Sequence, residues 1–497
     1  MDKRIAEICH LLPHSRYQKG VIAGFQDKQV IDGFRKWVEN LRIDDVGKAD
    51  KWEKDSFDLI ITYFPGRLRS SIIKDTFSAL RNGGTAAFLV RSRASASSVK
   101  NTILNQTDSQ GLVLEVYGLT PSLEDVRLAV PLQNRACAAA SLALYQPSLM
   151  KARIMKYAAY FLGRAGLSSL WAPCKLIIFQ KGSAGSLNGL PLLTKKLFRQ
   201  PVEYALFTGT PGYLRKSTVQ IMDPTGAILG YCKIGDNPQT RDVLSNEAEL
   251  LRFVNALSLG NAQAPEALFA GDTGAAAYLL IQSTRKGHLS AGPLIPDVRH
   301  LDLLTKLMGQ TKCESAFRAS ACYREVNDRL SSVRGYAGEQ HYQEIKDALE
   351  WSSHVLNRER IMLCLAHRDF TPWNTYVSDG KLFVFDWEFA RPNWAPLTDA
   401  FHFILQKGIL VDKAQPDTLW NRLMSESSKE GRFVRQCAST INASGDTLLV
   451  LLAFYLCDMT TMYLFHYGQE AETPPDGVRL ISTWRKLLQM TQERRGA

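Results

Sequence analysis

The sequence lacks the features of a secreted or membrane-spanning protein. Its nine cysteines are odd in number and form no CxxC pair, so we expect neither a disulfide framework nor a zinc ribbon. The first residues hold no apolar run of signal-peptide length, and the longest uncharged stretch, 136–150, is too short to cross a bilayer. The 497 residues, 45% of them hydrophobic, predict two to three globular units of a cytoplasmic protein.

Acidic residues are missing from one long segment. Between residues 126 and 202 there is no Asp or Glu, whereas eleven Lys and Arg stand there and the rest of the chain carries 49 residues of each sign. Such a segment creates a positive potential that attracts anions. No nucleic-acid-binding motif accompanies it, so we expect a peripheral contact with an anionic membrane through 126–202 and no nucleic acid.

The centre of this basic segment, residues 148–167, has the periodicity of a helix. At 3.6 residues per turn its apolar residues fall on one side and Arg153, Lys156 and Arg164 fall opposite. The apolar set is Met150, Ile154, Tyr157, Ala158, Phe161 and Leu162. The pattern fits a helix at a membrane interface, and it also fits a helix packed on its own domain with a solvated basic face.

A run rich in Gly and Ser divides the chain, and we interpret residues 183–200 as a linker. Residues 1–182 alternate strands with helices, which predicts an α/β domain with a largely parallel sheet. Residues 201–497 predict an α+β domain of two lobes, 201–288 and 289–497. The predicted strands are 57–64, 83–90, 111–119, 174–179, 203–208, 216–222, 227–235 and 276–283, with one strand pair around 376–386.

The sharpest motif begins at His367, continues through Asp369 to Asn374, and is followed twelve residues later by Asp386-Trp387-Glu388. Phosphoryl transfer needs a carboxylate that orients the attacking hydroxyl, and oxygen ligands for the Mg²⁺ that bridges the phosphates. Asp369 and Asn374 would lie on one loop that reverses direction. The strand before Asp386 would return this second carboxylate to the same phosphates.

This motif resembles that of the aminoglycoside phosphotransferase and choline kinase group, relatives of protein kinases whose loop reads H-x-D-x-x-x-x-N. The resemblance implies a protein-kinase-like fold for 201–497 that uses ATP and Mg²⁺. It makes Asp369 the catalytic residue and His367 a brace of its loop, while Asn374 and Asp386 would be the metal ligands. Asp399 would be the acid that steadies the loop.

By the same resemblance, a nucleotide site is expected upstream. Lys233 on a predicted strand and Glu247 on the next helix would form the pair that holds a lysine onto the phosphates, with Glu249 as the rival helix partner. The turn that contains Gly209 and Gly212 would cover the phosphates. The segment 282–284 would link the lobes and read adenine, with Gln282 as its candidate.

The N-terminal domain resembles S-adenosylmethionine-dependent methyltransferases over residues 20–180, which implies a Rossmann-like fold. Such enzymes hold the cofactor at a Gly-rich turn after the first strand. The candidate here is 20–25, with Asp44 or Asp45 as the ribose partner, but the full G-x-G-x-G turn is absent. We therefore expect the fold without methyl transfer, and S-adenosylmethionine is not expected to be a working cofactor.

These observations predict a phosphotransferase that acts on a hydroxyl of a small molecule, a sugar or a glycan or glycolipid precursor. One alternative is a kinase-fold scaffold that has lost turnover. Another is a bifunctional protein that phosphorylates and methylates one acceptor. The sequence does not identify the acceptor.

Overall fold

The fold comes from a computed structural model in which the chain forms two compact units. The first contains Met1–Thr210, Lys216–Leu244 and Ala267–Leu289, and the second contains Pro211–Arg215, Ser245–Glu266 and Ser290–Ala497. The described residues are 3–64, 69–91, 101, 104–105, 113–144, 150–182, 189–209, 212, 214–273, 277–287, 292–443, 445–468 and 473–495.

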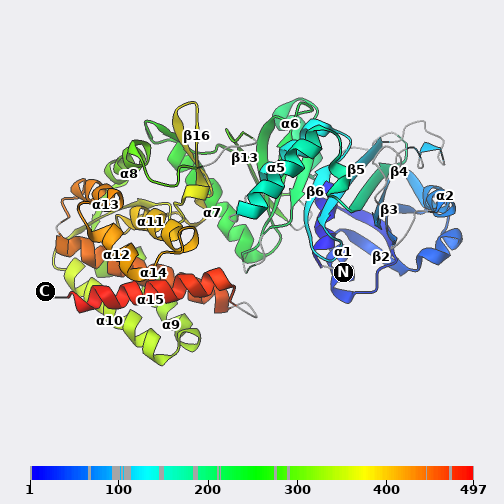
Figure 1. The fold of residues 1–497 in the computed structure, drawn as a ribbon. Coiled ribbons are helices and arrows are strands. Elements are labelled where there is room, and N and C mark those ends of the chain that lie inside the picture. Colours follow the sequence, from blue (N-terminus) through cyan, green and yellow to red (C-terminus); the bar gives the residue numbers. More distant parts are fainter. Residues whose placement is uncertain are drawn as a thin grey trace. The chain divides into compact units, whose positions relative to one another are not determined.

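The first unit is built on one 12-stranded sheet in the order β12-β13-β10-β9-β8-β6-β5-β7-β4-β3-β1-β2 (Figure 1). The strands are β1 (Tyr17–Ala23), β2 (Val38–Asp44), β3 (Phe57–Phe64), β4 (Leu80–Arg91), β5 (Val113–Pro121), β6 (Val126–Pro131), β7 (Cys174–Gln180), β8 (Glu203–Phe207), β9 (Ser217–Met222), β10 (Ile228–Gly235), β12 (Ala267–Asp272) and β13 (Tyr278–Ser283).

The helices of the first unit connect and cover these strands. They are η1 (Lys3–Leu11), α1 (Lys28–Arg35), η2 (Val46–Lys51), α2 (Ser70–Ala79), α4 (Arg135–Ala140), η3 (Ser141–Leu144), α5 (Met150–Arg164), η4 (Ser168–Leu170) and α6 (Gly189–Phe198), where η marks a 3₁₀ helix. A further helix, α7 (Pro238–Asn255), begins in the first unit and ends in the second.

Four strands at one end of the sheet, β2, β1, β3 and β4, are parallel. Ile22 of β1 pairs with Ile61 of β3, and both side chains are fully buried. A parallel strand covered on both faces reads as an apolar run rather than an alternation, which is why residues 57–64 could be predicted. The parallel layer of β1 to β4 agrees with the expected α/β arrangement. The predicted strands 111–119 and 174–179, however, form β5 and β7, which pair antiparallel, so the sheet is mixed rather than largely parallel. The Rossmann-like assignment of this domain stays a prediction.

The remaining strands of the sheet are antiparallel, and they include the predicted meander β8-β9-β10. Residue pairing continues from β6 to β8, where Leu128 lies opposite Phe207. Part of the predicted linker, 189–198, forms α6, and residues 183–188 lie outside the described residues. The domain boundaries at 182 and 200 stay a prediction. The sequence did not predict β1, β2, β6 and β12.

The second unit is mainly helical, with two small three-stranded sheets, β11-β17-β16 and β14-β15-β18. Its helices are α8 (Val298–Thr311), η5 (Phe317–Ala319), α9 (Ala321–Ala337), α10 (Glu339–Leu356), η6 (Pro372–Asn374), η7 (Trp387–Phe389), α11 (Thr398–Leu410), α12 (Pro416–Met424), α13 (Lys429–Ser439), α14 (Gly445–Gly468) and α15 (Pro475–Glu493). Its strands are β11 (Ala262–Gln263), β14 (Cys313–Ser315), β15 (Ile361–Ala366), β16 (Thr375–Ser378), β17 (Lys381–Val384) and β18 (Arg391–Trp394).

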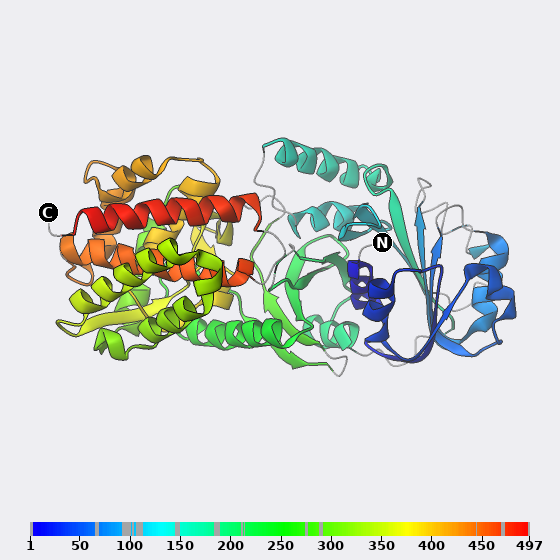
Figure 2. The same ribbon diagram turned by 90° about the horizontal axis from the view of Figure 1, so that it is seen from below.

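Helix α14 is the central element of this unit and packs against α9, α10 and α15. Figure 2 shows α15, in red, beside it. Among the described residues α14 is the one helix long and apolar enough to cross a membrane, but 83% of its most apolar window is buried in the protein. Its apolar composition therefore reflects core packing within the unit.

A buried ionic network joins α14 to its neighbours. Asp458 of α14 is fully buried and accepts hydrogen bonds from the guanidinium groups of Arg329 on α9 and Arg368, the latter at 2.7 Å. Its Oδ2 accepts the indole N–H of Trp394 at 3.1 Å, and the Arg368 guanidinium lies 3.9 Å from the centre of the same indole ring. Glu325 of α9 also pairs with both guanidinium groups, at 3.2 Å from Arg329 and 3.3 Å from Arg368. The fully buried Asp458 and the partly exposed Glu325 thus balance the two cations together and fix where α9 and α14 meet.

Replacing Asp458 by Asn should lower the free energy of unfolding by about 3–5 kcal/mol, because two guanidinium groups would lose their fully buried anion and keep only the partly exposed Glu325. Asp446 lies exposed in the first turn of the same helix, so Asp446→Asn is the matched control and should cost less than about 1 kcal/mol. Urea unfolding followed by tryptophan fluorescence measures both. Equal losses in the two variants would contradict the stabilising role of the network.

Candidate active site

The loop after β15 is held by a buried carboxylate. The backbone N–H groups of His367 and Arg368 each donate to one oxygen of Asp399, both at 2.8 Å. Arg368 has the left-handed φ of 64°, which is rare for a residue with a side chain and needs such fixation. Burial raises the pKa of the Asp399 carboxyl, while the neighbouring His367 and the two N–H donors favour its charged form. Asp399 therefore makes the contacts that a loop-steadying acid requires.

The side chain of His367 ties this loop to the segment that leads to Asp386. Its Nδ1 accepts the backbone N–H of Asp369 at 3.2 Å, and its Nε2 lies 3.0 Å from the carbonyl oxygen of Phe385. Because the first contact needs a lone pair and the second a proton, the ring carries its proton on Nε2. The imidazole is fully buried and packs on Trp387, with ring centres 4.6 Å apart.

Asp369 lies at the turn of the loop with its carboxylate held on both sides. Asn374 Nδ2 donates to Oδ2 at 2.7 Å, and His402 Nε2 lies 3.2 Å from Oδ1. The Asp369 side chain keeps 25% of its surface exposed. A carboxylate can accept about four hydrogen bonds, so lone pairs remain for an incoming hydroxyl.

His402 was not predicted from the sequence. It lies on α11 three residues after Asp399, so both side chains project from one face of the helix. Its Nδ1 lies 3.0 Å from the hydroxyl of Tyr455. Burial raises the pKa of Tyr455 well above its usual value, so the phenol keeps its proton. The Asp369 carboxylate only accepts, so His402 donates to it from Nε2. The spacing to Asp399 is the signal that could have found it.

Asn374 and Asp386 are neighbours at the open end of one hairpin. Strands β16 and β17 pair Thr375 with Val384, and the N–H of Phe385 donates to the carbonyl oxygen of Asn374 at 3.1 Å. Asp386 follows with a left-handed backbone, φ 70° and ψ 52°, which aspartate tolerates better than most residues. The two predicted metal ligands therefore start from adjacent backbone positions.

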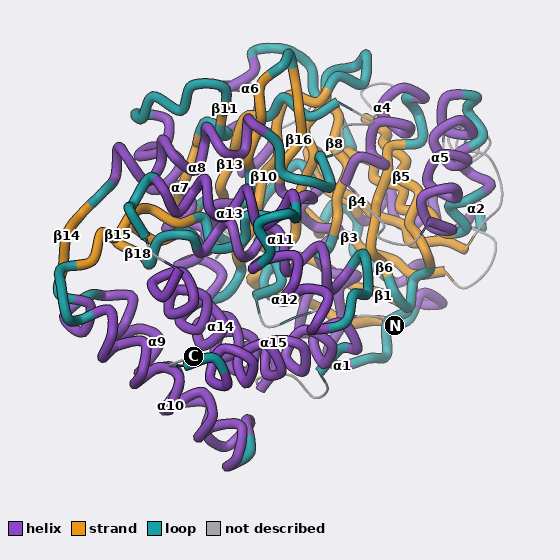
Figure 3. The backbone as a smooth tube through the Cα atoms, turned by 60° about the vertical axis from the view of Figure 1, so that its left-hand side comes forward, coloured by secondary structure: helices purple, strands orange, loops and turns teal. Residues whose placement is uncertain are grey.

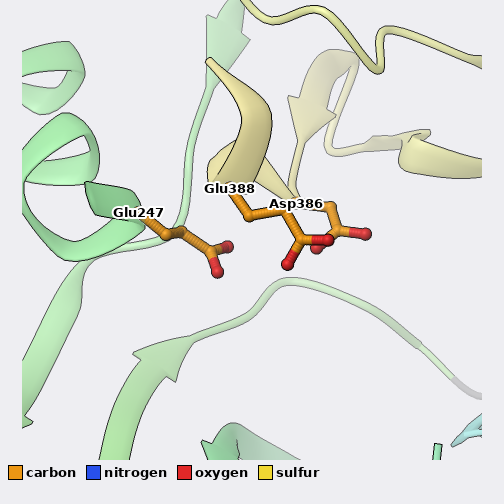
Figure 4. Close-up of side chains that lie close together, drawn as sticks. All are labelled: Glu247, Asp386 and Glu388. Carbon is orange, nitrogen blue, oxygen red and sulfur yellow. The ribbon is translucent and has the colours of Figure 1, made fainter. Parts of the chain in front are cut away.

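Three carboxylates gather beside this hairpin. Ligand oxygens of Glu247, Asp386 and Glu388 lie within 4.8 Å of one another, and Glu247 and Glu388 are buried. Figure 4 shows Glu247 reaching from α7 toward the carboxylates of the 386–388 segment. The segment is also fixed by Asn246, whose Nδ2 donates to the Glu388 carbonyl oxygen at 3.0 Å. Such a grouping of oxygen donors attracts a hard divalent cation such as Mg²⁺. Glu388 was not predicted as a ligand.

The other predicted nucleotide residues lie on separate elements. Lys233 is buried on β10 opposite Leu280 of β13, and Gln282 is buried on β13. Gly209 follows β8 with a positive φ of 80°. Gly212 lies at a bend, and its carbonyl oxygen accepts the Arg215 N–H at 3.2 Å. Residues 210, 211 and 213 lie outside the described residues. The nucleotide roles of these residues stay predictions.

Glu247 and its rival Glu249 differ in burial. Glu247 is fully buried, whereas Glu249, two residues later on α7, is exposed. A side chain that pairs with a buried group must itself be buried, so burial favours Glu247 over Glu249 as the partner of a buried residue. Its pairing with Lys233 stays a prediction.

A separate cavity of about 620 Å³ lies in the first unit. It opens at the carboxyl ends of β1 and β3, next to the point where the strand order reverses around β1. Its wall includes Gly24, Asp45 and Tyr63 but not Asp44, whose carboxylate accepts the Trp52 indole N–H at 3.2 Å. Gly24 has a φ of 84°, and a Cβ there would lie 2.6 Å from the Tyr63 carbonyl oxygen. The turn after β1 thus requires glycine because the Tyr63 backbone approaches it closely. The role of 20–25 in holding a cofactor stays a prediction.

No protein-family model and no curated protein matches the chain. Solved structures with a kinase-like phosphotransferase fold match about three fifths of it. An APH(2'') aminoglycoside phosphotransferase in complex with GDP and kanamycin has 15% identity and a TM-score of 0.41, covering 61% of this chain and 98% of its own. The choline kinase from Streptococcus pneumoniae has 13% identity and a TM-score of 0.41, covering 60% and 98%.

A third neighbour is aminoglycoside phosphotransferase APH(4)-Ia in a ternary complex with ADP and hygromycin B, with 13% identity, a TM-score of 0.40 and coverage of 62% and 98%. The methyltransferase-like interpretation of residues 1–182 receives no support from these comparisons.

Exchanging Asp399 for Asn should lower the free energy of unfolding by about 1–3 kcal/mol, because the amide NH₂ would face one of the two backbone N–H donors. Hydrogen exchange at His367 and Arg368 should become faster. Asp417 is exposed in the first turn of α12, and Asp417→Asn is the matched control. Unchanged exchange rates at residues 367 and 368 in the Asp399 variant would show that the loop does not depend on this carboxylate.

Proposed function

We propose that the protein is an ATP- and Mg²⁺-dependent phosphotransferase whose acceptor is a hydroxyl of a small molecule, a sugar or a glycan or glycolipid precursor. One observation carries the proposal. Asn374 binds the Asp369 carboxylate through Nδ2 and the backbone beside Asp386 through its carbonyl oxygen, so the base and the metal candidates share one rigid connection.

Asp369 is the group that receives the acceptor. Its carboxylate orients the hydroxyl and takes the proton, the hydroxyl oxygen bonds to the γ-phosphorus, and the bond from this phosphorus to the leaving diphosphate breaks. Asn374 and His402 hold the two carboxylate oxygens at 2.7 and 3.2 Å and so fix the direction of the remaining lone pairs. Orientation of this kind supplies a large part of the rate in phosphoryl transfer.

Asn374 and Asp386 suit the metal by the chemistry of their donors. The amide nitrogen of Asn374 donates to Asp369, which leaves the amide oxygen as its ligand atom. Glu388 and Glu247 add carboxylates to the same place. When bound, Mg²⁺ would neutralise charge on the phosphates. By sequence order alone, Lys233, Gly209, Gly212 and Gln282 stay candidates for nucleotide binding.

The neutral variant Asp369→Asn tests this proposal. It should lower phosphate transfer by about 10²–10⁴-fold, because an amide cannot accept the proton, while nucleotide binding is retained. Asp379 lies exposed at the tip of the β16–β17 hairpin, so Asp379→Asn is a matched control. The assay screens hydroxyl compounds with radiolabelled ATP or GTP and Mg²⁺, and calorimetry follows nucleotide binding.

The scaffold alternative predicts a different result. If the protein binds nucleotide but transfers phosphate to no acceptor in a broad screen, and if Asp369→Asn leaves its hydrolysis of ATP unchanged, the phosphotransferase proposal is wrong. Loss of nucleotide binding in Asp369→Asn would instead show that the variant disturbs the fold, which circular dichroism checks.

A second candidate function rests on the cavity in the first unit. Ligands of open parallel sheets bind at the carboxyl ends of the strands where the strand order reverses, which is where this cavity lies. Its wall combines the aromatic Phe25, Tyr63 and Phe64 with the acidic Asp27, Asp45 and Glu124, and no Lys or Arg is among its described lining residues. This chemistry favours a nucleoside without phosphates, such as S-adenosylmethionine, over a nucleotide. Binding there would support the bifunctional alternative.

Calorimetric titration of the whole protein with S-adenosylmethionine tests this candidate. This candidate function, unlike the sequence-based expectation, requires saturable binding, and Asp45→Asn should weaken that binding by roughly tenfold, because a charged hydrogen-bond acceptor is lost while asparagine still caps η2. Asp50→Asn, an exposed change on the same helix away from the cavity wall, should bind like the wild type. Absence of heat at saturating ligand would remove this function.

A further inference from the structure

Helix α5 turns its apolar side away from the protein. Ile154, Tyr157 and Phe161 lie on one face at spacings of three and four residues, and they are 63%, 48% and 67% exposed. The opposite face makes the contacts. Ala159 and Tyr160 pack against a buried cluster with Leu142, and Gly163 lies so close to Ala139 that a Cβ on the glycine would be 3.1 Å from the Ala139 Cα.

Figure 3 shows α4 beside α5, and α4 in turn contacts β6 and β8. Past the end of α5, Leu167, the residue before η4, and Leu170, the last residue of η4, are also exposed, at 47% and 72%. We call the whole set the α5 surface, which consists of Ile154, Met155, Tyr157, Phe161, Leu167 and Leu170. These are six of the fifteen large apolar side chains exposed among the described residues. A concentration of this kind marks an interaction site.

The sequence segment that contains the α5 surface carries charge of one sign. No acidic residue occurs between residues 126 and 202. Three of the eleven basic residues are engaged inside the unit, since Lys175 is buried, Lys181 binds Asp55 at 2.8 Å and Arg127 binds Asp125 at 3.0 Å.

Two other basic residues of this segment are exposed beside the α5 surface. Arg164 lies in the last turn of α5, and Arg135 lies next to Gly166, just after the helix. Exposed apolar side chains with basic flanks, on a segment whose sequence contains no acidic residue, are the composition of a helix that lies in a membrane interface. A face for a protein partner would not need to exclude carboxylates over the whole segment.

We propose that the α5 surface docks onto the headgroup and acyl boundary of an anionic lipid bilayer. The apolar side chains enter the boundary, and Arg135 and Arg164 pair with lipid phosphates. The proposal does not rest on the phosphotransferase activity, because none of its residues belongs to the candidate active site. It would place a lipid-linked acceptor near the protein.

Sedimentation with sucrose-loaded vesicles tests the proposal on the full chain. The wild type should bind vesicles of phosphatidylcholine and phosphatidylglycerol, bind phosphatidylcholine alone far more weakly, and release as salt rises. The double variant Ile154→Ser/Phe161→Ser should lose roughly tenfold or more of its binding, and Arg135→Gln/Arg164→Gln should lose the preference for the anionic lipid. All four residues are exposed, so folding should be unaffected.

The matched control is Arg252→Gln/Phe253→Ser, which alters an exposed basic and an exposed aromatic residue on α7. It should bind vesicles like the wild type. Equal binding by the control and the α5 variants, or equal binding to both vesicle types, would overturn the proposal. So would dimerisation in analytical ultracentrifugation that Ile154→Ser/Phe161→Ser abolishes, because the α5 surface would then belong to a second copy of the chain.

Discussion

The candidate active site depends on two hydrogen bonds from backbone N–H groups to the Asp399 carboxylate. They hold Arg368 in a left-handed conformation, which turns its guanidinium toward Asp458 in the core and sends the chain back so that Asp369 faces outward. The loop is therefore anchored in two ways, by the ion pair of Arg368 with Asp458 in the core and by the hydrogen bonds of its backbone to Asp399. A loop fixed in this way can present a carboxylate at low entropic cost, which is what positioning a reactant requires.

The same rigidity extends to the metal candidates through neutral groups. His367 joins the N–H of Asp369 to the carbonyl oxygen of Phe385, and Asn374 joins the Asp369 carboxylate to the Phe385 N–H. Both bridges end on the residue before Asp386. A displacement of Asp386 would therefore also displace Asp369, so the positions of the candidate base and of the candidate metal ligands are coupled.

Much of the fold and of the candidate active site could be predicted, because the interactions that form them are local in the sequence. The apolar run of 57–64, the hairpin near 376–386 and the juxtaposition of Asn374 with Asp386 follow from patterns within about twenty residues of sequence. His402, Tyr455 and Asp458 were missed, because they reach the loop from helices more than thirty residues away and look like ordinary core polar residues in the sequence. Of the three, His402 alone has a local signal, its three-residue spacing from Asp399. Strand β12 was missed since its residues are only partly buried and show no alternation.

Helix α5 shows a second kind of limit. Periodicity tells which residues share a face, but it does not tell which face the protein buries. Burial of the apolar face was a natural expectation, and here the contact is decided by size instead. Gly163 and Ala139 allow the backbones of α5 and the preceding helix to approach closely, and the larger Ile154 and Phe161 cannot occupy that contact. The face of α5 with small residues is therefore the buried one, and the face with large apolar residues is exposed outside the unit.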